Sequence, residues 1–485
     1  MKHTRIFATL VLVALMSSVS LAQMVSPVDF MRNNPRSTFA NPAFFTTDYG
    51  YFDLGLGGFN FGIQNIGLKY DNFFRFNEAG QPYVLDINQG VESLRDENYL
   101  NTFMNFDFFN CGRRTRHGYF TYLHRVRELQ TFSYNKDLVQ LLANGNAAFL
   151  GESNPADISL GLSVRAYQEF DLGYQMCLEE HWNIGFRLKF LMGFIDAKSN
   201  AMNVKLYTDP ETYAMKLMAA TDFVATLPYQ FVVEEGKLSI VDKRFNPANL
   251  FKNYGFGIDL GGEYIINDRF GVAAAVNDLG YIKWNNYAIN LSGGIQDGGS
   301  YYDNGAFVFS GLTSDQVNAL MNDPDFASGI ADSLSNYLDV NVQNLEEYTT
   351  KLNANYMIRG YFDLTPSNRF SAQFMGCNYG LGIQPAVTLA YTGSFSNKFD
   401  LVATYTMMPG SYDNVGAGLS ANFGGLLLYV ASNNILGFFN PANASHLHVQ
   451  LGMSLTSGEF VSRAETIIIR DKEAASVYED DDDEW

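Results

Sequence analysis

The stretch from Ile158 to Leu178 constrains the fold of this chain more than any other part of it. Its even positions are apolar except for Gln168, while its odd positions include Ser159, Arg165, Glu169 and Asp171. A period of two is that of a β-strand with one apolar and one polar face. At about 3.3 Å per residue this strand would reach roughly 70 Å, whereas strands of soluble sheets usually have about five or six residues. An ordinary soluble sandwich does not need such a strand.

The alternation resumes after a short polar break at residues 179–183. The second strand again presents apolar residues at its even positions, namely Ile184, Phe186, Leu188, Phe190, Met192 and Phe194. In water a second layer would have to cover this continuous apolar surface. In a bilayer it can face lipid, provided that the sheet closes and leaves no backbone edge unpaired. The pattern therefore predicts an all-β fold, a transmembrane antiparallel β-barrel.

Strands of the same kind recur along the chain, and we count fourteen, an even number as in single-chain bacterial barrels. Their ranges are 50–64, 101–110, 118–133, 158–178, 184–207, 254–266, 270–284, 352–364, 370–379, 386–394, 398–408, 413–423, 426–434 and 446–456. The connections after the even-numbered strands are short, while most of those after the odd-numbered strands are long. This asymmetry is expected of periplasmic turns and extracellular loops.

The two ends of the chain lie outside the predicted strands. Residues 1–22 have the basic start, the apolar centre and the small final residues of a secretory signal peptide. Residues 23–48 show neither period, and we expect them to form a periplasmic or luminal segment at the barrel mouth. The barrel itself spans residues 49–457, and residues 458–485 form an acidic periplasmic tail that ends in the run Glu479 to Glu484. These features predict that the protein lies in the cell outer membrane, in contact with its lipid.

Two parts of the long connections each allow two interpretations. Residues 285–351 form either one long extracellular loop, large enough to be a small cap, or a loop that contains an extra strand at NNYAINLSGG and a polar helix from Thr313 to Leu338. Two other loops carry apolar pieces with helical spacing, Leu138 to Leu142 and Tyr213 to Phe223. Such pieces fit either a recognition site for an apolar ligand or loops that pack on one another.

Charged residues share the polar, inward face of three neighbouring strands. They are Glu169, Asp171, Arg187, Lys189, Asp259 and Glu263. A turn that pairs Leu178 with Ile184 would place Gly173 opposite Lys189, with Asp171 on its diagonal. The sequence therefore predicts a ladder of alternating charge along the lumen, which is either a salt-bridge network that fills the interior or a selectivity surface.

The chain carries no motif that indicates catalysis or a cofactor. It has no phosphate-binding loop, dinucleotide fingerprint or metal-ligand spacing, and its six His residues have no recognisable nucleophile context. The one catalytic alternative is a lipase-like barrel with Ser and His on its outer wall. Cys111, Cys177 and Cys377 are an odd number without metal spacing. The net charge of -19 argues against nucleic acid as a partner, so we expect a non-enzymatic protein without a cofactor.

The tripeptide Asn-Pro-Ala occurs four times, at residues 41–43, 154–156, 246–248 and 440–442. Asn caps helices and Pro suits their first turn, so each copy predicts a turn or a short helix. The first copy has a further meaning. An irregular segment with Phe39-Ala40-Asn41-Pro42-Ala43, a signal peptide, fourteen strands and long apolar loops together resemble the long-chain fatty-acid outer-membrane transporters, the FadL-like superfamily.

Shorter motifs resemble uncharacterised outer-membrane barrels of Bacteroidota. They are Leu172-Gly173-Tyr174, the strand from Gly185 to Gly193, and Val276-Asn277-Asp278-Leu279-Gly280 with Trp284. The resemblance implies that Asn41, Pro42 and Ala43 belong to a hatch inside the barrel and that hydrophobic compounds pass through a kink in its wall. The charged tail and the insertion at residues 285–351 depart from the transporter pattern.

Two functions follow from this resemblance. The first is passive uptake of a hydrophobic or amphipathic small molecule, which the hatch-like segment and the apolar loops favour. The alternative is a non-transporting accessory barrel that binds a partner protein in type IX secretion or surface assembly. The acidic tail and the cap-sized loop favour the alternative.

Overall fold

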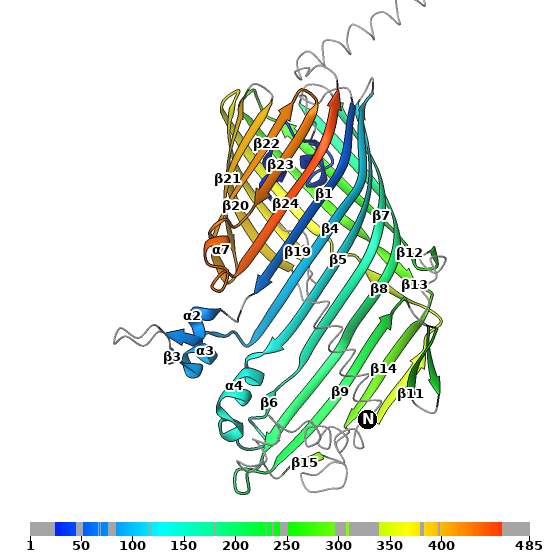
Figure 1. Cartoon of the computed structure of the whole chain (residues 1–485), viewed down its shortest axis with the longest axis vertical. Coiled ribbons are helices and arrows are strands. Elements are labelled where there is room, and N and C mark those ends of the chain that lie inside the picture. Colours follow the sequence, from blue (N-terminus) through cyan, green and yellow to red (C-terminus); the bar gives the residue numbers. More distant parts are fainter. Residues whose placement is uncertain are drawn as a thin grey trace, which may run out of the picture.

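The structure is a computed structural model (Figure 1). It describes residues 25–44, 52–65, 67, 69–75, 84–115, 118–178, 181–228, 230–234, 237–242, 251–295, 307–309, 339–378, 383–395 and 398–457. The predicted signal peptide, the acidic tail, the helix from Thr313 to Leu338 and the Asn-Pro-Ala copy at residues 246–248 lie outside these ranges. Within them, no helix combines the length and the apolar character needed to cross a membrane.

Fourteen antiparallel strands form a closed barrel. Each pairs with the next in chain order, and the last strand returns to the first through pairs such as Phe59 with Leu451, so the ring has no free edge. The strands are β1 (Phe52–Asn65), β4 (Glu97–Arg114), β5 (Gly118–Asn135), β7 (Leu160–Leu178), β8 (Trp182–Thr208), β12 (Tyr254–Ile265), β13 (Phe270–Trp284), β18 (Asn355–Thr365), β19 (Asn368–Asn378), β20 (Ile383–Phe395), β21 (Phe399–Met408), β22 (Ser411–Phe423), β23 (Leu426–Ser432) and β24 (His446–Ser457). The predicted fold class and all fourteen strands are confirmed, and the largest boundary error is at β4, predicted as 101–110.

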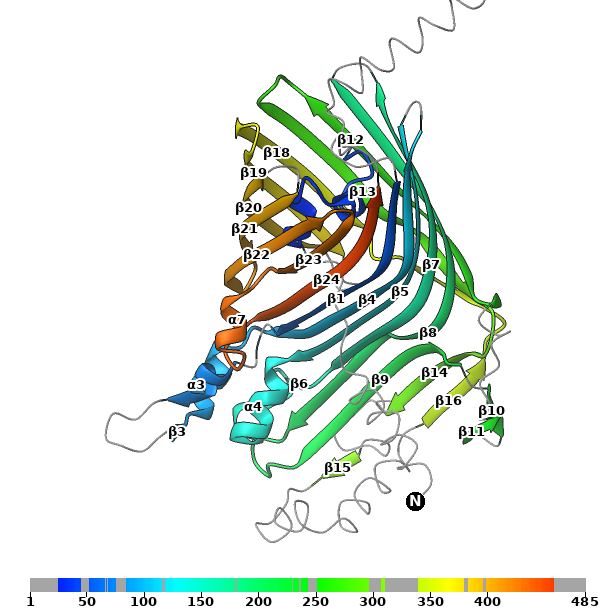
Figure 2. The same cartoon turned by 45° about the horizontal axis from the view of Figure 1, so that its top comes forward.

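The strands β4, β5, β7 and β8 are the longest of the barrel strands and continue beyond the barrel rim (Figures 1 and 2). The 27-residue strand β8 pairs with β12 as far as Met192 and then, from Asp196, with β9 (Met215–Thr226). Outside the barrel, β9 pairs with β14 (Ala288–Ile295), which pairs with β16 (Asp339–Asn344). One continuous strand therefore belongs to both the barrel and an outer sheet.

The long connections differ in part from their predicted structure. The helical structure predicted from Tyr213 to Phe223 is wrong, because most of this segment forms strand β9. The apolar helix at Leu138 to Leu142 is confirmed as part of α4 (Lys136–Asn144). The extra strand at residues 285–351 is confirmed as β14, and the same insertion also contains β15 (Phe307–Phe309), β16 and β17 (Tyr348–Lys351). The remaining short elements are α2 (Tyr70–Phe73), β2 (Phe74–Arg75), β3 (Val84–Leu85), α3 (Ile87–Ser93), η3 (Asn146–Ala148), β6 (Ala156–Asp157), β10 (Gln230–Glu234), β11 (Lys237–Asp242) and α7 (Leu436–Phe439).

Residues 25–44 form a compact segment inside the barrel, drawn in dark blue in Figure 2. It contains two 3-10 helices, η1 (Pro27–Phe30) and η2 (Pro35–Phe39). Ser26 caps η1 in a capping box with Asp29, and the Asn34 side chain caps η2. Each helix has Pro in its first turn, where the missing N–H group costs no hydrogen bond. Local caps therefore define this segment, which we call the luminal segment.

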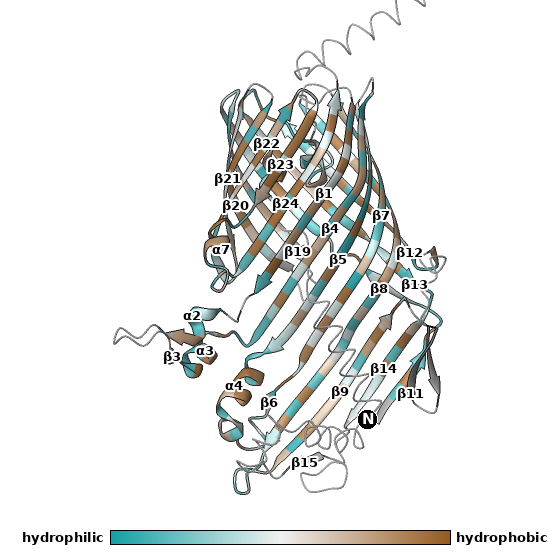
Figure 3. Cartoon of the chain, in the orientation of Figure 1, coloured by the Kyte–Doolittle hydropathy of each residue, from teal (hydrophilic) through white to brown (hydrophobic). Residues whose placement is uncertain are grey.

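The outer and inner faces of the barrel differ as the alternation predicts (Figure 3). Outward side chains are apolar and exposed, for example Leu188 at 53% and Ile358 at 62%. Inward polar side chains are buried, such as Asp171 at 1% and Thr388 at 0%. The outer face suits hydrocarbon, while side chains of the wall and the luminal segment fill this part of the lumen.

Candidate functional site: the lumen and its N-terminal segment

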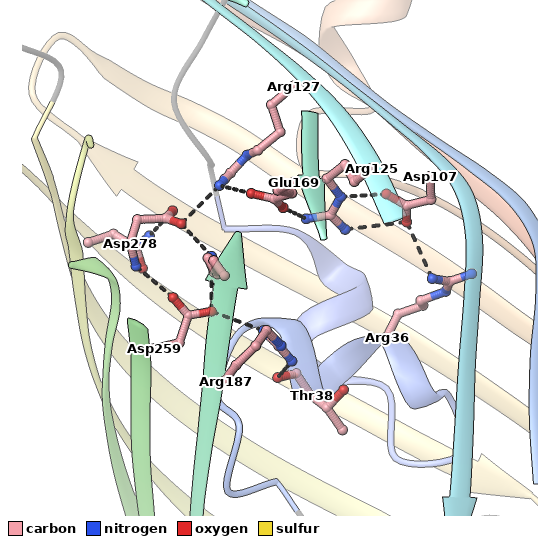
Figure 4. Close-up of polar contacts among 11 residues, drawn as sticks. Arg36, Thr38, Asp107, Arg125, Arg127, Glu169, Arg187, Asp259 and Asp278 are labelled. Carbon is pink, nitrogen blue, oxygen red and sulfur yellow. Dashed lines mark hydrogen bonds and ion pairs between the residues drawn. The ribbon is translucent and has the colours of Figure 1, made fainter. Parts of the chain in front are cut away.

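A continuous chain of alternating charges lines one half of the lumen (Figure 4). Its ion pairs have N–O distances between 2.5 and 3.5 Å. Every side chain in it is at most 9% exposed. The order of the chain is Arg36, Asp107, Arg125, Glu169, Arg127, Asp278, Lys189, Asp259 and Arg187. We call this set the charge chain.

Strand pairing explains most of these contacts. Arg125 lies directly opposite Asp107 on β4 and opposite Glu169 on β7, and Arg187 on β8 lies directly opposite Asp259 on β12. Opposite charges at such positions attract across the ladder. Because each charge is removed from water, its partner is needed to offset the desolvation cost. The register of the barrel wall therefore assembles the charge chain.

Asp278 enters the lumen through an irregularity of β13. The register between β12 and β13 shifts between Ile258 and Leu260, and Asp278 has a φ of 60°, which is uncommon for a residue other than Gly. The backbone N–H of Asp278 donates to Asp259 Oδ1 at 2.7 Å. Its carboxylate accepts from Arg127 and Lys189. The bulge thus supplies a central member of the charge chain, which sequence analysis missed.

Five of the six residues of the predicted ladder lie together, but their predicted register is wrong. Leu178 pairs with Trp182 instead of Ile184, so Asp171 lies directly opposite Lys189 and Gly173 lies opposite Arg187. The Lys189 ammonium nevertheless binds Asp259 and Asp278. Within the described part of the chain, Asp171 Oδ1 has no hydrogen-bond partner. Asp171 is therefore an additional carboxylate beside the charge chain.

The sixth residue, Glu263, belongs to a different contact group. Its carboxylate accepts from the Asn183 amide and, at 2.9 Å, from the Tyr361 hydroxyl. The guanidinium of Arg369 stacks on the Tyr361 ring, with its carbon 3.8 Å from the ring centroid. Glu263 thus links β8, β12 and β18 without joining the charge chain.

Both ends of the charge chain meet at the luminal segment. Arg36 belongs to this segment, while Arg187 on β8 donates to the Thr38 carbonyl at 3.0 Å. The Phe39 ring lies among three guanidinium groups, at 5.5 Å from Arg36, 5.1 Å from Arg125 and 4.9 Å from Arg187. Cation–π contacts of this kind hold an aromatic ring in a polar lumen.

Two glycines on neighbouring strands make room for Asn41, Pro42 and Ala43. Gly185 and Gly261 lie opposite each other on β8 and β12. A Cβ atom at Gly185 would overlap the Pro42 carbonyl, and one at Gly261 would overlap Asn41 Oδ1 and lie 3.0 Å from Ala43 N. The wall therefore lies so close to the luminal segment at these two positions that only glycine, which has no Cβ atom, fits.

The Asn41 side chain fixes this contact. Its Nδ2 donates to the carbonyls of Gly262 and Ala274, at 3.3 Å each, and its Oδ1 accepts from Ala43 N at 2.8 Å. A neighbouring amide on β13, Asn277, donates to the Ala40 carbonyl at 2.9 Å. Asn41 thus closes a local turn and binds two wall strands at once.

The other side of the luminal segment packs against strands that carry mainly apolar and hydroxyl side chains. Val25, Val28 and Met31 share a buried cluster with Val402 and Ala431, among others. The carboxylate of Asp400 on β21 also accepts from Asn33 N and Nδ2, at 2.6 and 3.0 Å.

A single guanidinium also holds this side of the segment. That of Arg359 lies between the rings of Phe30 and Phe44, at 4.1 and 4.6 Å from their centroids. It also donates to the Asp29 carbonyl at 2.8 Å. The two sides of the luminal segment therefore meet walls of different chemistry.

Among the described residues, no group of three or more His, Cys, Asp or Glu side chains is arranged to hold a metal ion. The closed ring of strands, its apolar outer face and the chain segment packed in its lumen define a transmembrane β-barrel with an occupied interior.

Comparison with known proteins places this barrel in a family. The chain belongs to the Family of unknown function (DUF5723), whose model matches residues 42–433. No curated protein matches it.

Solved structures with a similar course of the chain include a FadL homologue of Pseudomonas aeruginosa. It has 8% sequence identity and a TM-score of 0.40, with 91% of this chain and 100% of that chain covered. The toluene transporter TodX of Pseudomonas putida has 8% identity and a TM-score of 0.40, with 90% and 98% covered. The CymD monoaromatic hydrocarbon channel has 9% identity and a TM-score of 0.37, with 90% and 98% covered.

Proposed function

We propose that the protein is an outer-membrane channel for passive uptake of hydrophobic or amphipathic small molecules, and that the luminal segment is its hatch. The observation that carries the proposal is the way this segment is held. Wall side chains donate to its carbonyls, for example Arg187 to Thr38, Asn277 to Ala40 and Arg359 to Asp29. A segment held by side chains can leave the lumen without separating any pair of wall strands.

The chemistry around the segment supports the proposed ligand class. Phe30, Phe39 and Phe44 lie on the segment, and Met357, Met375 and Met408 are buried at the strands β18, β19 and β21. Met is flexible and polarisable, so it adapts to apolar ligands of irregular shape. The charge chain lies on other strands of the wall, namely β4, β5, β7, β8, β12 and β13. An amphipathic molecule would therefore find an apolar and a polar surface in the same channel, and the proposal needs no catalytic step.

Substitution of Gly261 by Val tests the hatch. The new side chain would collide with Asn41 Oδ1 and Ala43 N, and overpacking of this kind costs about 1–3 kcal/mol. Such a cost shifts the docking equilibrium roughly 5- to 150-fold towards an undocked segment. We expect higher ion conductance in planar bilayers and faster proteolysis within residues 25–44.

Gly262→Val is the matched control, because a Cβ atom at Gly262 has no neighbour within 4 Å. The hatch proposal is wrong if the Gly261 and Gly262 variants conduct alike. The uptake proposal has a separate test, which is the rate at which wild-type protein in liposomes admits a hydrophobic fluorescent probe. A rate equal to that of protein-free liposomes would refute uptake, whatever the conductance of the variants.

The accessory role in secretion or surface assembly depends on the acidic tail and the cap-sized insertion at 285–351. The tail and much of the insertion lie outside the described residues, and no observation on the described residues favours this role.

A further inference from the structure

An apolar groove of about 750 Å³ crosses the outer wall of the barrel, on the face turned to lipid. It extends over β13, β18, β19, β20 and β21, which are neighbours in the ring. Its axis follows one row of paired residues, Val272, Gly360, Ala372, Leu389 and Tyr405. Four steps between strands of about 4.8 Å make this row about 19 Å long.

Small side chains form the floor of the groove, and aromatic side chains form its flank. Gly360 and Ala372 lie opposite each other in the floor. A Cβ atom at Gly360 would meet nothing within 4 Å, so the space above it is open. On the flank, Phe270 packs against Phe362 at 4.7 Å between ring centroids, and Phe370 packs against Tyr391 at 5.4 Å. The concavity is thus built into the wall.

One end of the groove reaches the short turn between β12 and β13. Ile266 and Phe270, which both line the groove, flank this turn. The turn has a fixed shape, since Asn267 Oδ1 accepts from the N–H groups of Arg269 and Phe270 at 2.9 and 3.0 Å. Asp268 and Arg269 are both exposed there. The apolar groove therefore ends beside one exposed acid and one exposed base.

We propose that this groove binds one acyl chain of a zwitterionic phospholipid, whose headgroup lies against Asp268 and Arg269. The groove is continuous with the lipid-facing wall, and its length of about 19 Å suits a chain of one leaflet, because half of a hydrocarbon core is about 15 Å thick. Arg269 complements the phosphate and Asp268 complements the ammonium of a headgroup such as phosphatidylethanolamine. This site is independent of the luminal segment and of the proposed uptake.

Native mass spectrometry of the full-length barrel tests the proposal. The purified protein is incubated with equal amounts of phosphatidylethanolamine, phosphatidylglycerol and phosphatidylcholine, and the retained lipids are counted. We expect phosphatidylethanolamine to be retained above phosphatidylglycerol. Filling the floor with Gly360→Leu should lower retention about tenfold, equivalent to about 1.4 kcal/mol.

Gly262→Leu is the matched control for the floor, because Gly262 also has open space for a Cβ atom but does not line the groove. Ala372→Leu is a second floor variant, and the gel shift between unboiled and boiled samples verifies that each barrel folds. Equal lipid retention by the Gly360, Ala372 and Gly262 variants would overturn the proposal that the acyl chain lies in the groove.

The headgroup contact has its own test. The double variant Asp268→Asn with Arg269→Gln should lose the preference for phosphatidylethanolamine, whereas Lys398→Gln, at an exposed cation on another turn, should keep it. A preference unchanged in the double variant, or equal retention of all three lipids by the wild type, would overturn the headgroup assignment.

Discussion

The two halves of the lumen both pack against the luminal segment, but their wall side chains differ in chemistry. The strands β4, β5, β7, β8, β12 and β13 supply all wall members of the charge chain. The strands β19 to β21 instead present mainly hydroxyl and apolar side chains, such as Thr388, Thr404, Met375 and Val402. Their one described contact of a carboxylate with the luminal segment is that of Asp400, which accepts from Asn33. The luminal segment matches each half, with Arg36 and the Thr38 carbonyl towards the charges and Val28 and Met31 towards the apolar side.

The charged half makes contacts that depend on specific partners, whereas the other half makes contacts that can rearrange. A buried ion pair depends on its partner and on good geometry, so a lost member is costly. Apolar contacts have no required direction, and side chains such as Met tolerate rearrangement. We therefore expect the charged half to fix the position of the luminal segment and the other half to yield first.

The largest effect is expected from Asp278→Asn in the charged half. Asn tolerates the positive φ of this position but leaves Arg127 and Lys189 short of a countercharge. We expect the free energy of unfolding to fall by about 3–5 kcal/mol. The control is Thr388→Val in the other half, which removes the hydrogen bond to Thr406 Oγ1 and should cost about 1 kcal/mol. Urea titrations in lipid vesicles measure both, and equal losses would contradict the distinction between the halves.

A pH effect is expected from Asp29 on the luminal segment. Burial raises the pKa of this carboxyl from 3.8 to about 6, although the Ser26 N–H and Arg359 act in the opposite direction. The docked segment therefore binds the proton more tightly than the free segment. This contribution to docking is fully present below pH 3.8 and is lost as the pH rises through about 6.

Limited proteolysis of residues 25–44 measures this effect. Cleavage should be roughly tenfold slower at pH 5 than at pH 7.5, because a pKa shift of this size changes the docking equilibrium on that scale. The ratio must be corrected for the pH dependence of the protease itself on an unfolded substrate. In the Asp29→Asn variant the corrected pH dependence should disappear, and a persistent dependence would assign it to another group.

The smallest effect is expected from Gly418→Ala in the apolar half. The added Cβ atom would lie 2.7 Å from Met31 Cε and 2.9 Å from Pro27 Cβ. The Met31 side chain can rotate away and the Pro27 ring has to shift slightly, so the cost should be about 1 kcal/mol, at the low end of the range for overpacking. In Gly261→Ala, in the charged half, the added Cβ atom would collide with the amide of Asn41 and the backbone of Ala43. We therefore expect faster proteolysis of the luminal segment in Gly261→Ala than in Gly418→Ala. An equal effect at both glycines would show that the halves hold the segment alike.

The sequence predicts the wall of this barrel well, because closure in lipid imposes a period of two on every strand. It could not fix the register of β7 against β8. Pairing Leu178 with Trp182 or with Ile184 differs by two residues, which leaves every side chain on the same face, so the hydrophobic pattern is identical in both cases. Only the conformation of the turn decides between them.

The charge chain was only partly predictable for related reasons. Arg125 and Arg127 follow the polar period of β5, and the alternation could have identified them. Asp278 could not be assigned by parity, since the bulge in β13 turns an extra residue inward. The pair Asn277 and Asp278 within an otherwise apolar strand was the available signal. Arg36 joins the chain from a segment without any period, so its place depends on tertiary packing alone.

The change of partner along β8 has a mechanical consequence. Arg187 and Lys189 lie on the half of this strand that pairs with β12, while residues 196–208 pair with β9 in the outer sheet. A force applied to the outer sheet by a surface polymer or a neighbouring molecule would pass along unbroken backbone to the residues that touch Thr38, Asp259 and Asp278. Strand β8 thus joins the outer sheet directly to residues that contact the luminal segment.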